Sequence, residues 1–267
     1  MSATQRAGTP PAGTPKGVLQ LRQLFPLALG VVQLRPDPLE SALQLQAIRE
    51  LQGGSLSNPN PGCAWTGDLN GVWQLQRHVD FTALISTLLG HAWRYLEELG
   101  FAREAVALHL QRCWPVVSEP GQVVGRHHHP NAHISGVYYL NGDGSGRSGC
   151  LRLYPPSASN ELVPGLAVGH GGPIRIGSEQ ASLWNAPWFD LAPRAGLLVL
   201  FPAAVQHAVL ENEDPEESRF SISFDLLLTA PPANAGQEAG EYLAPHPQDW
   251  QPVQDGQHSP TEHAQGP

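Results

Sequence analysis

The chain has 267 residues, with 15 basic and 24 acidic side chains and a net charge of −9. Glycine and proline contribute 28 and 26 residues, whereas charged residues make up only 15% of the chain. This composition favours a loop-rich β protein over a helical bundle. Because the net charge is negative and Lys16 is the single lysine, without any basic run, we expect no nucleic-acid partner.

The cellular setting is predicted from cysteines and apolar runs. The three cysteines, at positions 63, 113 and 150, are odd in number and far apart, so neither a disulfide framework nor a cysteine metal site is indicated. Residues 1–16 lack the apolar centre of a signal peptide, and no apolar run approaches the ~18 residues of a membrane span. We expect a cytoplasmic protein without a membrane partner.

Both ends of the chain are poor in side chains that could be buried. Residues 1–16 are mostly Ala, Gly, Thr and Pro, and residues 231–267 hold seven prolines and no Lys or Arg. Such segments cannot offset their ordering entropy by burial, so we predict an N-terminal and a C-terminal tail. Residues 17–230 then form one domain.

The first half of this domain, residues 37–100, has helical periodicity. Asp37 followed by proline is a helix start, and apolar residues at three- and four-residue steps continue to Gly53. A second helix is predicted from an N-cap at Asp80, over a similar apolar stripe, to Gly100.

After Gly100 the apolar period changes from 3.6 to 2, which indicates strands. Many short strands with Gly/Pro turns predict a mainly β, α+β domain, a sandwich or jelly roll over residues 105–228, with the helices packed outside one sheet. The predicted strands are 106–111, 134–140, 149–154, 173–177, 196–201 and 219–228.

Histidines gather just before one of these strands. In an extended chain, side chains at i and i+2 face the same side, so His127 and His129 can share a ligand while His128 points away. His207, which follows a buried strand and a turn, is a candidate third ligand. The alternative is that the cluster is a solvated loop and His207 a hydrogen-bonded surface residue.

Arg219 begins an otherwise apolar strand. An arginine entering a core strand is costly unless it meets a carboxylate, and a ligand carboxylate gripped by the guanidinium would satisfy it. Ser221, two positions on, could donate a second hydrogen bond from the same face. The alternative is a salt bridge at the rim with Glu216, Glu217 or Asp225.

These motifs resemble the iron(II)- and 2-oxoglutarate-dependent oxygenases, and most closely a bacterial and phage family marked by H-x-H-P-x-x-x-x-SGVYY, here residues 127–139. That family also shows an early LFP, here residues 24–26, and an SN followed by Trp, here 57–58 and Trp65. The resemblance covers roughly residues 20–228 and extends to prolyl hydroxylases over the same core. It implies a double-stranded β-helix that uses Fe(II), 2-oxoglutarate and O₂, in a hydroxylase that couples 2-oxoglutarate decarboxylation to substrate oxidation.

By position, the resemblance also implies the roles of individual residues. Iron would be held by His127, His129 and His207. The distal carboxylate of 2-oxoglutarate would meet Arg219 and Tyr139, with Ser221 beside them and Leu151 lining the pocket. One departure concerns the usual triad of two histidines and a carboxylate, because His129 stands where the carboxylate would be.

Two further features remain open at this stage. The segment 155–192, with Trp184, Trp188 and Phe189, is long enough for a lid over the pocket, or else is a peripheral excursion with its own apolar cluster. His133 is a spare ligand candidate or a residue of the strand face. The expected substrate is a small molecule or a peptide.

Two other functions also fit H-x-H…H. One is a three-histidine zinc hydrolase or hydratase that activates water. The other is a non-catalytic cupin-like protein that binds a metal or ligand. Metal analysis separates zinc from iron, and succinate release separates an oxygenase from a binding protein.

Overall fold

The computed structural model describes residues 24, 26–55, 60–157, 160, 186–232 and 243–253. Two sequence predictions, the strand at 173–177 and the tail over residues 1–16, lie outside the described residues. No helix in the described part of the chain is both long and apolar enough to cross a membrane. In the same part, Cys113 and Cys150 form no disulfide.

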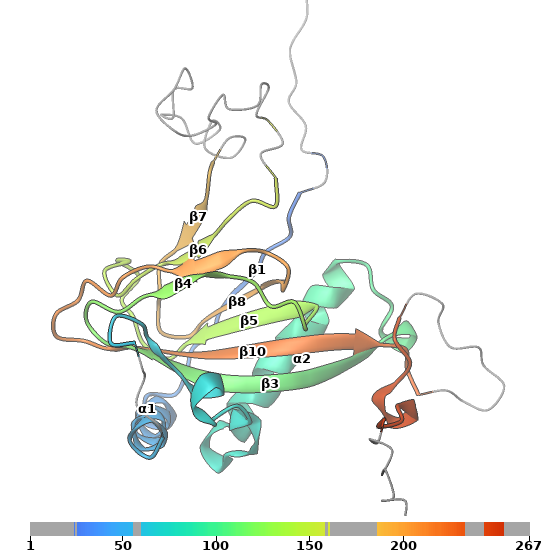
Figure 1. The fold of residues 1–267 in the computed structure, drawn as a ribbon, viewed down its shortest axis with the longest axis horizontal. Coiled ribbons are helices and arrows are strands. Elements are labelled where there is room, and N and C mark those ends of the chain that lie inside the picture. Colours follow the sequence, from blue (N-terminus) through green and yellow to red (C-terminus); the bar gives the residue numbers. More distant parts are fainter. Residues whose placement is uncertain are drawn as a thin grey trace, which may run out of the picture.

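Two antiparallel sheets form the body of the protein (Figure 1). The larger sheet has the order β1-β8-β5-β10-β3-β2, and its strands are β1 (Gly30–Gln33), β8 (Leu197–Pro202), β5 (Ile134–Tyr139), β10 (Arg219–Thr229), β3 (Ala107–Ser118) and β2 (Trp65–Thr66). The smaller has the order β4-β9-β6-β7, with β4 (Val124–His127), β9 (His207–Val209), β6 (Leu151–Leu153) and β7 (Phe189–Leu191). The mainly β jelly roll predicted from the sequence is confirmed.

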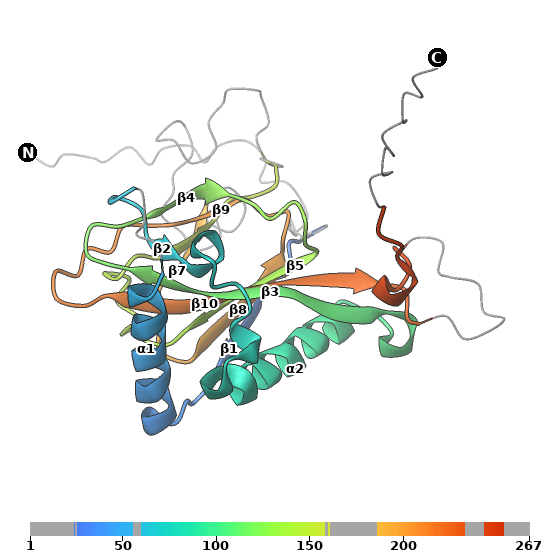
Figure 2. The same ribbon diagram turned by 60° about the horizontal axis from the view of Figure 1, so that its bottom comes forward.

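The helices lie on one side of the larger sheet (Figure 2). Helix α1 (Pro38–Gly53) begins as predicted, because Asp37 Oδ1 accepts hydrogen bonds from the backbone N–H groups of Leu39 and Glu40. Helix α2 (Thr82–Glu98) begins later than predicted. The proposed cap Asp80 lies inside a short 3₁₀ turn (Val79–Phe81) that precedes the helix, so its side chain does not cap α2.

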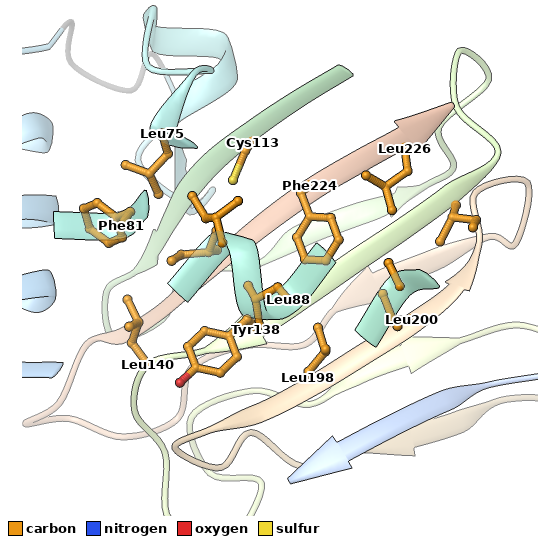
Figure 3. Close-up of a cluster of buried hydrophobic side chains, with 14 of the residues drawn as sticks. Leu75, Phe81, Leu88, Cys113, Tyr138, Leu140, Leu198, Leu200, Phe224 and Leu226 are labelled. Carbon is orange, nitrogen blue, oxygen red and sulfur yellow. The ribbon is translucent and has the colours of Figure 1, made fainter. Parts of the chain in front are cut away.

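The main hydrophobic core lies between these helices and the larger sheet (Figure 3). Phe81 and Leu88 from the helical side meet Tyr138, Leu198 and Phe224 from three neighbouring strands. A second, smaller cluster fills the other side of the sheet. Its buried members are Tyr139, Leu151, Leu153, Leu197, Val199, Phe201 and Val205. Alternate residues of β5 and β8 therefore serve opposite faces, as period 2 requires.

Residues near the C-terminal end return to the domain. Leu243 packs against the main core cluster, and the Ala230 N–H donates a 2.8 Å hydrogen bond to the Ala244 carbonyl. The imidazole of His246 lies 5.0 Å from that of His109 between ring centroids. These contacts fall inside the segment that the sequence predicts as a tail.

Candidate metal centre

Three histidines converge where the smaller sheet meets the chain that leads into β5. His127 ends β4 and lies opposite His207, the first residue of β9. His129 lies two residues beyond β4, is only 8% exposed, and is anchored by a backbone hydrogen bond to the Ala203 carbonyl. One ring nitrogen from each of the three lies within 4.8 Å of the others. The intervening His128 is exposed, as the i, i+2 argument predicts.

Hydrogen bonds fix the orientation of all three rings. Nδ1 of His127 is 2.7 Å from the Gly125 carbonyl, and Nδ1 of His207 is 2.9 Å from the Val205 carbonyl. Nδ1 of His129 is 2.5 Å from a carboxylate oxygen of Asp225. These acceptors favour a proton on each Nδ1, which leaves Nε2 as the nitrogen that can bind a metal.

Burial keeps the rings in the ligating form. Desolvation, together with the neighbouring His127, lowers the pKa of His207 to about 3. Burial also lowers the pKa of His127. Both imidazoles are therefore neutral at physiological pH, and neutral imidazoles suit iron, zinc, copper or nickel.

Asp225, on β10, is the functional residue that sequence reasoning missed. It is fully buried; its Oδ1 bonds His129 and accepts a 2.9 Å hydrogen bond from Ser135 Oγ, and its Oδ2 accepts hydrogen bonds of 2.9 Å from Arg112. Burial alone would raise the pKa of this carboxyl, but the bonds from His129 and Ser135 and the charge of Arg112 hold it below the usual value. Asp225 is thus a carboxylate behind the histidine cluster.

The histidines line a cavity of about 460 Å³ that extends toward Arg219. The predicted pocket residues Tyr139, Leu151 and Ser221 line the same cavity. Ser221 lies directly opposite Tyr139 on adjacent strands of the larger sheet. Residues predicted from separate motifs therefore share one pocket.

Arg219 is buried, at 1% exposure, without a carboxylate among its described neighbours. Its Nη1 donates hydrogen bonds of 2.9 Å to the carbonyls of Ser148 and Gly149, while its Nε has no partner. The alternative partner Asp225 lies six residues along the same strand and bonds His129 and Arg112 instead. The rim salt bridge considered from the sequence is absent from the described residues.

Tyr139 adds a second unpaired polar group to this end of the cavity. Its side chain is 1% exposed, and its hydroxyl has no hydrogen-bond partner in the structure. Burial raises its pKa to about 12, so the phenol keeps its proton and can donate a hydrogen bond. Buried polar groups are rarely left unpaired, so Tyr139 and Arg219 indicate a ligand with acceptor oxygens.

The other predicted residues lie away from the cavity. His133 is exposed, and its Nδ1 accepts a 2.9 Å hydrogen bond from the Leu228 N–H, which makes it a residue of the strand face. Trp188 lies beneath the guanidinium of Arg152, 4.2 Å from it, and Phe189 is an exposed residue of β7. Neither lines the cavity, and Trp184 lies outside the described residues.

The segment that contains this site is similar to a known protein family. Residues 112–225 match the family described as “Putative 2OG-Fe(II) oxygenase”, a segment that contains the three histidines, Arg219 and Asp225. This segment, 114 of the 267 residues, is similar to the 2OG-Fe(II) oxygenases. The cofactors of such an oxygenase are Fe(II) and 2-oxoglutarate, with O₂ as the other cosubstrate. The three converging histidines and the unpaired donors of Arg219 and Tyr139 fit this requirement.

Solved structures of α-ketoglutarate-dependent enzymes show a similar fold. The non-heme α-ketoglutarate-dependent epimerase SnoN from nogalamycin biosynthesis is 17% identical, with a TM-score of 0.52 over 84% of this chain and 92% of that one. The carbocyclase SnoK from the same biosynthesis is 16% identical, with a TM-score of 0.52 over 76% of this chain and 82% of that one. No curated protein matches the chain.

Proposed function

We propose that this oxygenase is a hydroxylase in which His127, His129 and His207 hold Fe(II). Arg219 and Tyr139 bind the distal carboxylate of 2-oxoglutarate, with Ser221 beside them and Leu151 against the cosubstrate chain. When bound, Fe(II) supplies the redox chemistry that activates O₂ and couples 2-oxoglutarate decarboxylation to substrate oxidation. The protein binds, orients and shields these groups.

One observation carries this proposal: a single cavity has three converging imidazoles at one place and two unpaired buried donors at another. A buried guanidinium without a counter-charge is costly, and a dicarboxylate ligand would remove that cost. A zinc hydrolase gives Arg219 and Tyr139 no such partner. An oxygenase gives a role to the residues at both ends of the cavity.

The neighbourhood of Arg219 orients its guanidinium for this role. Gly149 has φ = +88°, and a Cβ there would lie 2.2 Å from the Leu210 carbonyl and 2.8 Å from Arg219 Nη1. The absence of a side chain lets the Ser148 and Gly149 carbonyls hold one edge of the guanidinium. The Nε edge stays open to a ligand carboxylate.

The remaining pocket residues exclude water from the reaction. Leu151 and Phe201, both at most 1% exposed, lie along the cavity with Val137 and Val209. We propose a small-molecule or peptide substrate that enters at the exposed side, near Arg126 and His128. Cytoplasmic location and the domain limits at residues 17 and 230 stay predictions from the sequence.

Isotope transfer tests the hydroxylase proposal. A metabolite and peptide screen for stimulated succinate release from 2-oxoglutarate identifies a substrate, and the product from ¹⁸O₂ should then gain one labelled oxygen. A product oxidised without label would show a desaturase or an oxidative cyclase instead, and an unlabelled isomer of the substrate would show an epimerase. A protein that binds Fe(II) and 2-oxoglutarate without ever releasing succinate above the metal-free control would contradict the proposal.

A further inference from the structure

The oxygenase lacks a carboxylate among its three converging side chains, yet it keeps one directly behind them. Non-heme Fe(II) oxygenases commonly use two histidines and one carboxylate. Here His129 occupies the carboxylate position of the sequence motif, and Asp225 bonds its Nδ1. Of the three histidines, only His129 has a carboxylate as the partner of its Nδ1, since the corresponding acceptors for His127 and His207 are neutral backbone carbonyls.

We propose that Asp225 is a positioning residue that, through its hydrogen bond to His129, gives the metal site the negative charge a carboxylate ligand would otherwise supply. This inference rests on the proposed function, because it requires a metal at the three histidines. An Nδ1–H bonded to a carboxylate makes the imidazole a more basic ligand and fixes the ring. The negative charge then lies on Asp225, behind His129, instead of on a side chain that binds the metal directly.

The surroundings of Asp225 divide its two oxygens between two tasks. Oδ1 faces His129 and Ser135, whereas Oδ2 accepts both contacts from Arg112. Ser135 Oγ lies 2.9 Å from Oδ1 and 3.0 Å from His129 Nδ1, so it closes the small triangle that these two groups form. Three elements, β3, β5 and β10, therefore fix the carboxylate against the ring.

A purely structural role would be the neutralisation of Arg112. Two observations disfavour it. The Arg112 side chain is 28% exposed, and it has a second carboxylate, Asp68, 3.4 Å from its Nη1. Moreover, the shorter contact of Asp225 is made to His129 and not to Arg112. Two carboxylates share one guanidinium, which leaves a net negative charge on this side of the histidines.

A reversal of sign in a double-mutant cycle tests the proposal, with anaerobic Fe(II) affinity as the readout. Asp225→Asn should weaken Fe(II) binding about 10–100-fold, the usual effect of losing an outer-shell partner of a metal ligand. In a His129→Asp background the carboxylate already stands in the motif position, and Asp225 faces it as a like charge. There, Asp225→Asn should strengthen Fe(II) binding. The same sign in both backgrounds would overturn the proposal.

Asp68→Asn is the matched control, because it removes the other carboxylate on Arg112 but no contact to a histidine. The charge of Asp68 acts on His127 only through space, so this change should weaken Fe(II) binding less than Asp225→Asn does, and an equal loss would contradict a role for the bond to His129. A spectroscopic readout accompanies the affinity. With less negative charge at Fe(II), the visible charge-transfer band formed with added 2-oxoglutarate should move to shorter wavelength in Asp225→Asn.

Two outcomes separate this inference from the proposed function. If His129→Ala binds Fe(II) as wild type does, the metal site itself is wrong. If His129→Ala loses Fe(II) while Asp225→Asn keeps wild-type affinity, only the role of Asp225 is wrong. Should Asp225→Asn not fold, Arg112→Gln is compared with Arg112→Gln/Asp225→Asn, which lacks both charges, and the proposal requires the weaker Fe(II) binding in the double variant.

Discussion

The ring of Phe224 lies across Gly136, its partner on the adjacent strand β5. A Cβ on Gly136 would lie 2.1 Å from Cζ of that ring, far inside contact distance. Ser135 and Tyr139, one and three positions from Gly136 on β5, face the other way: Ser135 bonds Asp225, and Tyr139 reaches the cavity. The glycine of the SGVYY motif therefore lets an aromatic core residue cover the strand that carries two residues of the site.

Gly136→Ala should destabilise the protein strongly. Overpacking usually costs about 1–3 kcal/mol, and a clash with a ring held in the main core belongs at or above the upper end. Chemical denaturation measures the change. Gly90→Ala is the control, because nothing lies within 4 Å of that exposed position in α2, and the change should stabilise by about 0.5–1 kcal/mol. Phe224→Leu in the Gly136→Ala background should recover part of the loss; no recovery would contradict the packing argument.

Replacing any of the three converging histidines by alanine should abolish stoichiometric Fe(II) binding. The loss should exceed the roughly 10–100-fold effect of an outer-shell change, since a ligand atom itself is removed. Anaerobic equilibrium dialysis with Fe(II) measures it. His128→Ala should bind Fe(II) nearly as wild type does, because His128 is exposed while its two neighbours converge. An equal loss at His128 would refute the assignment of the ligands.

Arg219→Ala should weaken 2-oxoglutarate binding while Fe(II) binding persists. Removing one partner of a buried, hydrogen-bonded charge pair costs about 2–5 kcal/mol, or roughly 30- to 4,000-fold in affinity. Titration of the anaerobic Fe(II) protein with 2-oxoglutarate, followed by the visible charge-transfer band, gives both affinities. Arg219→Lys should restore only part of the binding, because an ammonium cannot reproduce the guanidinium geometry. An Ala variant with wild-type affinity would remove the cosubstrate assignment.

The metal-free protein should lose stability in acid. The pKa of His207 falls from 6.5 when unfolded to about 3 when folded, so between these values the unfolded chain binds the extra proton. The contribution of His207 to the free energy of unfolding is therefore fully present above about pH 6.5 and declines below it. At pH 5 the loss from His207 alone is roughly 2 kcal/mol. Denaturation midpoints of the metal-free protein from pH 5 to 7.5 measure this. His207→Gln should flatten the slope, and an unchanged slope would contradict the lowered pKa.

Truncation after residue 232 should cost a small amount of stability and no metal affinity. It removes Leu243, which packs against the main core, and the hydrogen bond between Ala230 and Ala244. Complete burial of a leucine contributes about 1.5–3 kcal/mol, so a half-buried one should contribute about 1 kcal/mol. Thermal unfolding detects this. Truncation after residue 253 keeps these contacts and should match the full chain; equal Tm values for both truncations would show that Leu243 contributes nothing.

Local patterns were sufficient for much of the fold and for most of the candidate site. The six-residue strands β5 and β8 and helix α1 carry their own periodicity and were predicted within one or two residues. Strands such as β4 and β9, of four and three residues, are too short to show a period, and they were missed. Yet β9 begins with His207, which was predicted because a polar residue follows a long buried strand.

Asp225 could not be found in this way because its role depends on pairing between distant strands. Its partners His129 and Arg112 lie 96 and 113 positions away along the chain. From the sequence alone, Asp225 was considered only as a neighbour of Arg219, since both lie on one strand. Alternation does place the two on the same face of β10, but six residues apart. The register of β10 against β3 and β5 determines which side chains each of them meets.

Strand β10 carries Arg219, Ser221, Ser223 and Asp225 on its cavity face, and Phe220, Ile222, Phe224 and Leu226 on its core face. The first and last of the polar residues are six positions apart, about 20 Å along an extended chain. A shift of β10 by one residue would exchange its two faces. The guanidinium and the carboxylate would then enter the hydrophobic core, and four large apolar side chains would enter the pocket. A misregistered molecule would then lose the polar side chains of the pocket and its hydrophobic core together. The register of β10 therefore links the stability of the core to the composition of the pocket.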